Sequence, residues 1–427
     1  MLRSVRSPHY GLLPVPVVAA TGMMCAVCRL STALAGLASL AAVVVAGIPV
    51  SGAVAADGSV GAVRTVVGPA VLDTPGGLAL SAAGDLFVAD TGHCRVLVVP
   101  ANSGTRYGLR LYAGHAATLA GRSCTGAGSI GHPSGVAVDA QGDVYIAEAT
   151  AQRVQVVRPA GRAVVTVAGT GRAGFNGNGL AGNASELDEP TGVAVDGSGD
   201  VVIADTANCR VRVLAARSST LFGRAMATGH LYTVAGTGVC GSAGQGGPVA
   251  AAQLWNPVAV AVDSAGDLLV ADDGDQSVLL APTRGGTFYG RAVGAGDIGL
   301  VVGGTGGYGP YVADGLAATG PAAELNDPRG LAVGSSGALV VTDGFMHAVR
   351  VVPSSDETLF GRPMTAGDLY TAAGAMPVTS PAGAGDGTRW VLTHLGTPTG
   401  VAVSASGTVY VADAGDDTVR AIAGGGT

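Results

Sequence analysis

Residues Pro133 to Val157 read PSGVAVDAQGDVYIAEATAQRVQVV, and residues Pro190 to Leu214 read PTGVAVDGSGDVVIADTANCRVRVL. The same pattern of about 25 residues starts again at four further positions, Pro75, Pro257, Pro328 and Pro398. Each copy contains three apolar runs rich in Val and Ala, separated first by a turn signal such as DAQGD and then by a polar loop such as EATAQR. This pattern predicts three short antiparallel strands in every copy. Self-similarity of this kind indicates a repeat architecture.

A fourth apolar run, which ends in Gly, lies between successive copies. Val164 to Gly169 and Leu231 to Gly236 are examples. Another such run, Val63 to Gly68, precedes the first copy, and only five residues follow the last copy. Four strands repeated radially are typical of a β-propeller blade, and a blade shared between the two ends of the chain closes the ring without an unpaired edge. The sequence therefore predicts an all-β, six-bladed propeller with four antiparallel strands per blade, in which the N-terminal strand joins the last blade.

The six copies resemble NHL repeats. The elements P-x-G-V-A-V-D, V-Y-V-A-D and R-V-x-V are typical of that family, and the resemblance covers nearly all of residues 62 to 423. The linking segments Thr220 to Gly236 and Thr358 to Gly374 resemble those of secreted actinobacterial members. The resemblance implies the fold, but propellers of this kind serve as protein- or sugar-binding modules, and a minority are metal-dependent lyases or lactonases. Family resemblance therefore leaves the class of function open.

Composition agrees with one large all-β domain. The 427 residues include 71 Gly and 21 Pro, which supply many turns, and 48% apolar against 12% charged residues supply an ample core. All 23 basic residues are Arg, so Schiff-base chemistry and a Walker lysine are excluded. Three of these Arg and none of the 30 acidic residues lie in residues 1–56, which leaves a net charge of −10 beyond that segment. No nucleic-acid partner is expected at that charge.

Residues 1–56 have the composition of a leader. Arg29 precedes an apolar run from Leu30 to Ile48, which is followed by Pro49 and the small residues of Gly52 to Ala56. This order predicts a secretory signal peptide, cleaved after Ala55 or Ala56, and a mature propeller of residues 57–427. An uncleaved membrane anchor is the alternative, because about 19 apolar residues can span a bilayer. We therefore expect a secreted, extracellular protein, attached to the cell envelope and in contact with the membrane only if the leader is retained.

Cysteine placement supports export. Cys94 in ADTGHCRV and Cys209 in ADTANCRV occupy the same position of the loop between the second and third strands. Cys124 and Cys240 follow the fourth strand, 30 and 31 residues downstream. In a propeller this loop and the crossover to the next blade emerge on the same face, so the predicted disulfides are Cys94–Cys124 and Cys209–Cys240. Four free thiols in a reducing compartment are the alternative.

A carboxylate ends the second strand of every copy. Its presence in all six copies indicates a structural role, since an active site needs asymmetry. We expect it to accept hydrogen bonds from backbone N–H groups of the loop that follows, with Arg95, Arg153 and Arg210 paired to that loop. The six residues are Asp90, Glu148, Asp205, Asp272, Asp343 and Asp413.

The position before each repeat Pro differs from blade to blade and begins the innermost strand, at the mouth of the channel. These residues are Thr74, His132, Glu189, Asn256, Asp327 and Thr397. His132, Glu189, Asn256 and Asp327 are therefore candidate binding residues. The simplest interpretation is a solvated polar rim with no cofactor, and the alternative is a zinc or calcium site. The acidic loops Asp272 to Gln276 and Asp413 to Asp417 are further candidates for calcium.

Aromatic residues make up only 4% of the chain, and Trp255 and Trp390 both lie in the crossover segments. An exposed Trp there suggests a binding platform, and a Trp that covers a loop is the alternative. The GxSxG and HExxH motifs of hydrolases and metalloproteases are absent from the sequence. We therefore expect a monomeric binding module for a protein or glycan that uses its crossover loops. A metal-dependent lyase or lactonase-like hydrolase and a structural envelope component are the alternatives.

Overall fold

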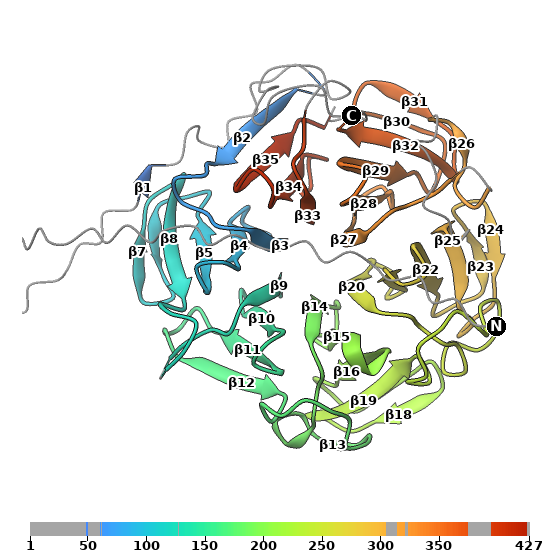
Figure 1. Ribbon diagram of the computed structural model, residues 1–427, viewed down its shortest axis with the longest axis horizontal. Helices are drawn as coiled ribbons and strands as arrows, with labels where there is room; N and C mark the ends of the chain where they lie inside the picture. Colours follow the sequence, from blue (N-terminus) through green and yellow to red (C-terminus); the bar gives the residue numbers. More distant parts are fainter. Residues whose placement is uncertain are drawn as a thin grey trace, which may run out of the picture. The chain divides into compact units, whose positions relative to one another are not determined.

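Six sheets of four antiparallel strands follow one another around a common axis, in the order of the chain (Figure 1). The computed structural model describes residues 48–49, 60, 62–126, 128–304, 314–320, 323–374 and 394–424. The protein is therefore an all-β, six-bladed propeller, as the six sequence copies predict. Each copy forms the three inner strands of one blade, and the run that ends in Gly forms the fourth.

Within each blade the strands run from the axis outward in the order first, second, third and fourth. Blade 1 contains β3 (Pro75–Leu80), β4 (Leu86–Asp90), β5 (Arg95–Val99) and β8 (His115–Ala120). Blade 2 contains β9 (Pro133–Val138), β10 (Val144–Glu148), β11 (Arg153–Val157) and β12 (Val164–Ala168). Blade 3 contains β14 (Pro190–Val195), β15 (Val201–Asp205), β16 (Arg210–Leu214) and β19 (His230–Ala235).

Blades 4 to 6 repeat this order. Blade 4 contains β20 (Pro257–Val262), β21 (Leu268–Asp272), β22 (Ser277–Ala281) and β25 (Gly299–Gly303). Blade 5 contains β27 (Pro328–Val333), β28 (Leu339–Asp343), β29 (Ala348–Val352) and β32 (Asp368–Ala373). Blade 6 contains β33 (Pro398–Val403), β34 (Val409–Asp413), β35 (Thr418–Ile422) and β2 (Val63–Val67). Short outer strands extend three blades: β1 (Ile48–Pro49), β13 (Leu180–Ala181) and β26 (Leu316–Ala317).

The ring closes by pairing strands from the two ends of the chain. Strand β2 lies antiparallel to β35, with Val63 opposite Ile422. The predicted closure is therefore confirmed. Residues 1–47 of the predicted leader and the cleavage positions at residues 55 and 56 lie outside the described residues. Among the residues that are described, no helix has the length and apolarity needed to cross a membrane.

Apolar side chains of neighbouring blades pack against each other and form the core. The second strand is fully buried in all six blades, and the third strand is buried apart from at most one end residue in five blades, because each sheet is covered on both faces. Val and Ala dominate these strands, since β-branched and small side chains pack well between closely spaced sheets. The core between blades 1 and 2, for example, includes Val98 of β5 and Val144 of β10.

Around the axis, the first strands of adjacent blades approach too closely to admit a side chain at the Gly of the P-x-G motif. A Cβ on Gly192 would lie 2.7 Å from the carbonyl oxygen of Val258 in the next blade. At the same junction the Thr191 hydroxyl donates to that carbonyl at 2.7 Å. Hydroxyl groups make equivalent bonds at five of the six junctions, from Thr91, Ser134, Thr191, Thr342 and Thr399.

The junction between blades 4 and 5 departs from this pattern. Val258, Ala271 and Asp273 occupy the three positions that supply the hydroxyl elsewhere, and none of these side chains has one. Ala259 also replaces the Gly of the P-x-G motif in blade 4. The junction between blades 4 and 5 therefore differs from the other five in both the hydroxyl position and the Gly position of the repeat.

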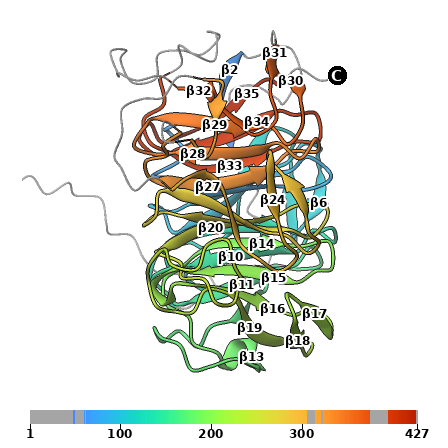
Figure 2. The ribbon, with the colours of Figure 1, turned by 90° about the vertical axis from the view of Figure 1, so that its right-hand side faces the viewer.

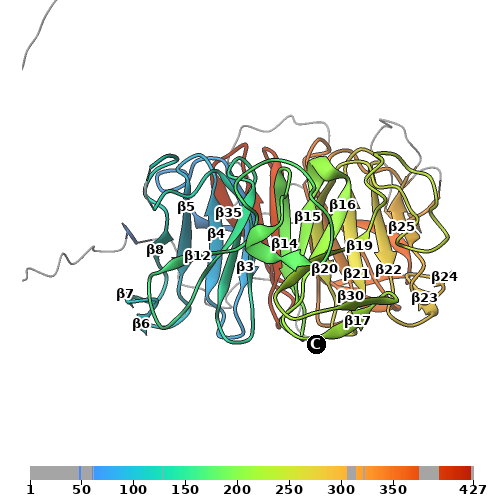
Figure 3. The same cartoon turned by 90° about the horizontal axis from the view of Figure 1, so that it is seen from below.

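Among the described residues, four blades carry an additional two-stranded hairpin, here called an arm, between their third and fourth strands. Figures 2 and 3 show the arms along one edge of the propeller. The arms project from the same side of the ring as the turns between the first and second strands. The loops between the second and third strands, and the crossovers to the next blade, project from the opposite side. The arms are β6 (Gly104–Arg106) with β7 (Leu109–Leu111), β17 (Ser219–Leu221) with β18 (Arg224–Met226), β23 (Gly286–Phe288) with β24 (Arg291–Val293), and β30 (Glu357–Leu359) with β31 (Arg362–Met364).

Candidate binding site at the channel mouth

Two disulfides fix the crossover loops on one side of the ring, which we call the crossover-loop face. Cys94 is bonded to Cys124 with the α-carbons 5.0 Å apart, and Cys209 to Cys240 with the α-carbons 5.3 Å apart. Both predicted pairs are confirmed. Since each bond joins the loop after the second strand to the following crossover, both kinds of loop emerge on this face, as the propeller strand order requires.

The recurring carboxylates are structural, and their hydrogen-bond donors differ from the expected ones. All six residues are fully buried. In each blade a carboxylate oxygen accepts a hydrogen bond from the backbone N–H of the residue two positions before the repeat Pro. The N–H of Asp73 donates to Asp90, and the N–H of Asp188 donates to Asp205, both at 2.8 Å. The register explains this, because the end of the second strand lies opposite the repeat Pro of the first strand. The loop that follows supplies side chains, such as Asn208, which donates to Asp205 at 2.9 Å, and in blade 5 it supplies the predicted backbone donor, Met346, to Asp343.

Two of the three arginines predicted to pair with the loop after the second strand bind the carboxylate instead, whereas Arg210 contacts that loop as predicted. Arg95 donates to Asp90 at 2.6 Å, and Arg153 donates to Glu148 at 3.0 Å. Arg210 instead donates to backbone carbonyls, and the fully buried Arg212 lies 3.2 Å from Asp205. Burial raises the pKa of Asp205, and the hydrogen bonds and the Arg212 charge oppose that effect.

A cavity of about 560 Å³ occupies the channel, lined by the first strands of all six blades. Its wall includes several glycines, such as Gly76, Gly192 and Gly400, because the glycines that permit close packing also face the axis. Of the predicted ring, Thr74, Asn256, Asp327 and Thr397 line the cavity.

His132 and Glu189 are exposed on the crossover-loop face and are not part of the cavity wall. The His132 ring lies 3.2 Å from the Thr150 hydroxyl, and the Glu189 backbone N–H donates to the Gln152 side chain at 2.6 Å. The structure thus brings together two of the four predicted binding residues, Asn256 and Asp327, and leaves the other two outside the cavity.

Polar side chains gather at the part of the mouth formed by blades 4 and 5. The Asn256 amide donates to Asp273 at 3.1 Å, and the Arg329 guanidinium donates to Asp327 at 2.6 Å. All four residues line the cavity. Burial, and next the negative charge of Asp327, raise the pKa of Asp273. This part of the mouth therefore offers an amide, two carboxylates and a guanidinium within one small region.

Exposed aromatic side chains flank these polar groups. Trp255, next to Asn256, is 52% exposed, and its side chain packs over Gly274. Phe345, in the loop after the second strand of blade 5, is 65% exposed, and its N–H donates to the Asn326 carbonyl at 3.1 Å. Trp390 lies outside the described residues. We call Trp255, Asn256, Asp273, Asp327, Arg329 and Phe345 the mouth patch.

Arg329 and Phe345 were not predicted from the sequence, and Asp273 was considered only as part of the acidic loop Asp272 to Gln276. Asp273 and Arg329 stand where other repeats have small, hydroxyl or apolar residues, and Phe345 stands in a loop that is polar or small in the other repeats. Comparing the repeats for residues that break the pattern, rather than for residues that recur, would have found all three.

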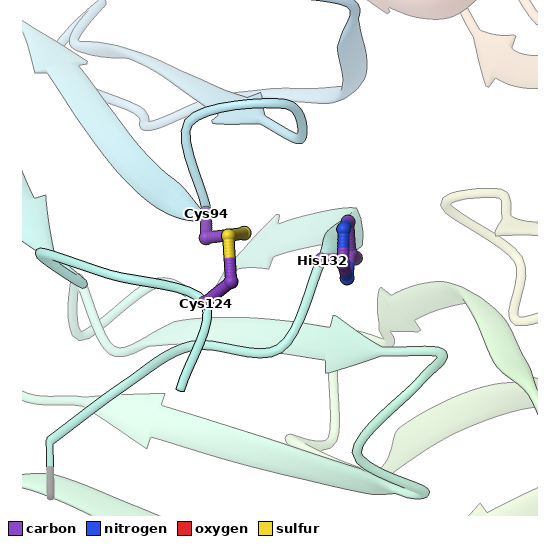
Figure 4. Close-up of side chains that lie close together, drawn as sticks. All are labelled: Cys94, Cys124 and His132. Carbon is purple, nitrogen blue, oxygen red and sulfur yellow. A yellow bond between two sulfur atoms is a disulfide. The ribbon is translucent and has the colours of Figure 1, made fainter. Parts of the chain in front are cut away.

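A metal site is not evident among the described residues. Their only group of three His, Cys, Asp or Glu ligand atoms within 4.8 Å of one another is Cys94, Cys124 and His132. Figure 4 shows that the two sulfur atoms form the disulfide. A disulfide offers no thiolate for coordination, so this group is not a plausible zinc site.

Comparisons with known proteins agree with the fold. The NHL repeat family model matches residues 72–99, 131–157 and 187–214, which are the inner strands of blades 1 to 3. The Arabidopsis thaliana protein SUPPRESSOR OF QUENCHING 1, chloroplastic, is 35% identical over 83 residues, which span 19% of this chain and only 8% of that protein.

Solved structures from Bacteroides have similar folds. A protein of unknown function from Bacteroides thetaiotaomicron has a TM-score of 0.55 at 16% identity, over 85% of this chain and 76% of that one. An auxiliary nutrient binding protein from the same organism has a TM-score of 0.52 at 11% identity, over 83% and 69% of the two chains. Another from Bacteroides ovatus has a TM-score of 0.51 at 13% identity, over 83% and 70%. Three of the six blades thus contain matches to the NHL repeat model.

Proposed function

We propose that this protein is a secreted, monomeric binding module that takes its ligand, a glycan or a protein, on the crossover-loop face. The mouth patch carries the proposal. It combines two exposed aromatic side chains with hydrogen-bonding groups at the opening of a 560 Å³ cavity. Long loops on a rigid scaffold are a common place for binding sites, and concave sites with a few convergent polar groups are typical of ligand recognition.

A glycan fits the chemistry of the mouth patch best. The carboxylates of Asp273 and Asp327 accept hydrogen bonds from hydroxyl groups, and the Asn256 amide both donates and accepts. The flat rings of Trp255 and Phe345 offer apolar surfaces against which a sugar ring can pack. The small residues around the channel leave room for the end of a chain to enter.

Two disulfides support an extracellular location, since disulfides persist in oxidising compartments. The nutrient-binding proteins of similar fold are compatible with a binding role, although at 11% and 13% identity they show the fold alone. The alternative class, a metal-dependent lyase or lactonase-like hydrolase, requires a bound metal, so the metal content of the purified protein distinguishes it from a metal-free binding module.

Glycan-array screening of the purified protein, followed by calorimetric titration of the best glycan, tests the proposal. We expect Trp255→Ala and Phe345→Ala each to weaken binding by about tenfold or more, because truncating an aromatic anchor removes most of its contact area. The melting temperature should hardly change, since both side chains are exposed. Tyr112→Ala is the matched control, because Tyr112 is an exposed aromatic residue outside the mouth patch.

If both patch variants bind as the wild type does, the ligand site lies elsewhere. If the protein binds no glycan but captures a protein partner through the same side chains, the site is a protein interface.

A further inference from the structure

The two disulfides stand at the same place in the repeat, but their surroundings differ at one position. His132 precedes the repeat Pro of blade 2, after the crossover that holds Cys124. Asn256 is the corresponding residue of blade 4, after the crossover that holds Cys240, and its amide donates to Asp273 at 3.1 Å. The chain therefore contains two equivalent disulfides, one followed by an imidazole and one followed by an amide that is already used elsewhere.

The His132 ring lies close to its disulfide. One ring nitrogen and the sulfur atoms of Cys94 and Cys124 are all within 4.8 Å of one another (Figure 4). Zinc binds thiolate sulfur at about 2.3 Å and imidazole nitrogen at about 2.0 to 2.1 Å, usually in a tetrahedron, so its ligand atoms lie about 3.5 to 3.8 Å apart. If the S–S bond is broken, the two sulfur atoms need only separate to this distance. The three ligand atoms are thus near the spacing that zinc requires.

The site is open to solvent on the crossover-loop face. Cys124 and His132 are exposed, whereas Cys94 is fully buried. An exposed sulfur gives a reductant access to the disulfide, and exposed disulfides are commonly the labile ones. The Thr150 hydroxyl lies 3.2 Å from His132 Nδ1 and restricts the orientation of the ring, as outer contacts of metal-bound imidazoles do. Water can supply a fourth ligand from the solvent side.

We propose that Cys94, Cys124 and His132 form a redox-controlled zinc site. The site cannot bind metal while the disulfide is present, and it binds one zinc ion after the disulfide is reduced. In the reduced protein the ion replaces the disulfide as the link between the loop after the second strand of blade 1 and the crossover to blade 2. The site is separate from the mouth patch and does not depend on the proposed glycan binding.

The redox step is a two-electron exchange with a dithiol. The dithiol gives two electrons and two protons, the S–S bond breaks, Cys94 and Cys124 become thiols, and the dithiol becomes a disulfide. Zinc then displaces the two thiol protons and binds a lone pair of the neutral His132 ring, since the metal coordinates thiolate and unprotonated imidazole. A disulfide oxidant takes the two electrons back, which restores the S–S bond and releases the ion.

Binding of Co²⁺ to the reduced full-length protein tests the proposal, because Co²⁺ can replace zinc and gives charge-transfer absorption when thiolates bind it. Cys25 and Cys28 are replaced by Ser in every sample, so that only the four propeller cysteines contribute. The protein is reduced with a dithiol, which is removed under argon before the titration. We expect one Co²⁺ per chain, displaced by zinc, and no binding before reduction. Zinc should also raise the melting temperature of the reduced protein, since it binds only the folded site.

Matched variants separate the two disulfides. Cys209→Ser with Cys240→Ser keeps the proposed site, and we expect it to bind Co²⁺ as the parent does. Cys94→Ser with Cys124→Ser keeps only the pair without a histidine, and we expect no saturable charge-transfer signal.

His132→Asn copies the residue of blade 4 and leaves both disulfides in place. It should not change the melting temperature of the oxidised protein, because His132 is exposed. After reduction it should weaken Co²⁺ binding by at least about tenfold, since even outer contacts of zinc ligands contribute about 10- to 100-fold.

Three results would overturn the proposal. The first is a reduced parent protein that binds no Co²⁺. The second is equal affinity of His132→Asn and the parent, which would show that the imidazole is not a ligand. The third is equal binding by the two double variants, because a pair of thiolates would then suffice without the histidine.

Discussion

Asp272 is the one recurring carboxylate whose blade offers no arginine. In the other five blades, an Arg stands five or seven residues after the recurring carboxylate. Blade 4 has Ser277 and Leu279 at these positions. The Asp272 side chain is fully buried and accepts the Trp255 backbone N–H at 2.9 Å. Burial, and next the nearby charges of Asp275 and Asp273, raise its pKa to about 7.

The raised pKa makes the stability of the protein depend on pH in a defined direction. Between the ordinary pKa of 3.8 and the raised value of about 7, the folded protein keeps a proton that the unfolded chain has released. The stabilisation from the neutral carboxyl is thus fully present below pH 3.8 and is lost as the pH rises through 7. At about 1.4 kcal/mol per pH unit, this interval corresponds to about 4 kcal/mol of unfolding free energy.

Asp272→Asn tests this reasoning, because the amide oxygen still accepts the Trp255 N–H while the titrating charge is removed. We expect the unfolding free energy of the variant to exceed that of the wild type by about 1.5 to 2 kcal/mol at pH 5 and by about 4 kcal/mol at pH 8, because the interval between pH 3.8 and pH 7 is only partly crossed at pH 5. Denaturant unfolding at a series of pH values, followed by circular dichroism, measures both differences.

The equivalent carboxylate of blade 3 provides the control. Asp205→Asn leaves the buried Arg212 guanidinium without its carboxylate, which should cost about 3 to 5 kcal/mol at both pH values. If Asp272→Asn also destabilises the protein at pH 8, then Asp272 is ionised and compensated in the folded state, and the assignment of a raised pKa is wrong.

Three further predictions concern the ring itself. Gly192→Ala places a Cβ 2.7 Å from the Val258 carbonyl oxygen and should lower the unfolding free energy by about 1 to 3 kcal/mol, measured by denaturant unfolding. Thr399→Val removes the 2.7 Å hydrogen bond to the Pro75 carbonyl and should cost about 1 kcal/mol in the same assay, whereas no change would show that this bond contributes little. Reduction of both disulfides should lower the melting temperature, since losing a native disulfide typically costs about 2 to 5 kcal/mol, and non-reducing peptide mapping should recover the two pairs.

Repetition is the reason that the fold was predictable from the sequence. Six copies with the same alternation of apolar runs and turns define six blades, and the extra run from Val63 to Gly68 defines the closure. The disulfide pairs followed from the same repeat, because Cys94 and Cys209 stand at one repeat position and their partners at nearly one offset. Each of these predictions depends on the positions of residues within a blade, which the repeat specifies directly.

The candidate site was only partly predictable, because its two hydrogen-bonded pairs belong to different blades. Asn256 and Asp327 were identified from their position before the repeat Pro. Asp273 directly follows the second strand of blade 4, and Arg329 lies in the first strand of blade 5, next to Asp327. Only the closed ring brings the two pairs to the same cavity. His132 and Glu189 share the repeat position of Asn256 yet remain outside the cavity wall, so a shared repeat position does not ensure a shared environment.

The departures from the repeat coincide at the junction of blades 4 and 5. Ala259 replaces a glycine of close approach, Asp273 replaces a residue that elsewhere supplies a hydroxyl, and the blade 4 carboxylate Asp272 has no arginine. Asp273 and its neighbours leave this junction without the hydroxyl contact made at the other five, and Asp273 places a carboxylate at the channel mouth. A six-fold repeat can form a distinctive site only where one blade differs from the others. The mouth patch therefore lies at the junction where the packing between blades departs from the repeat. A binding site on a repeat scaffold is expected at such a position, because local rules of structure are most often broken at functional sites.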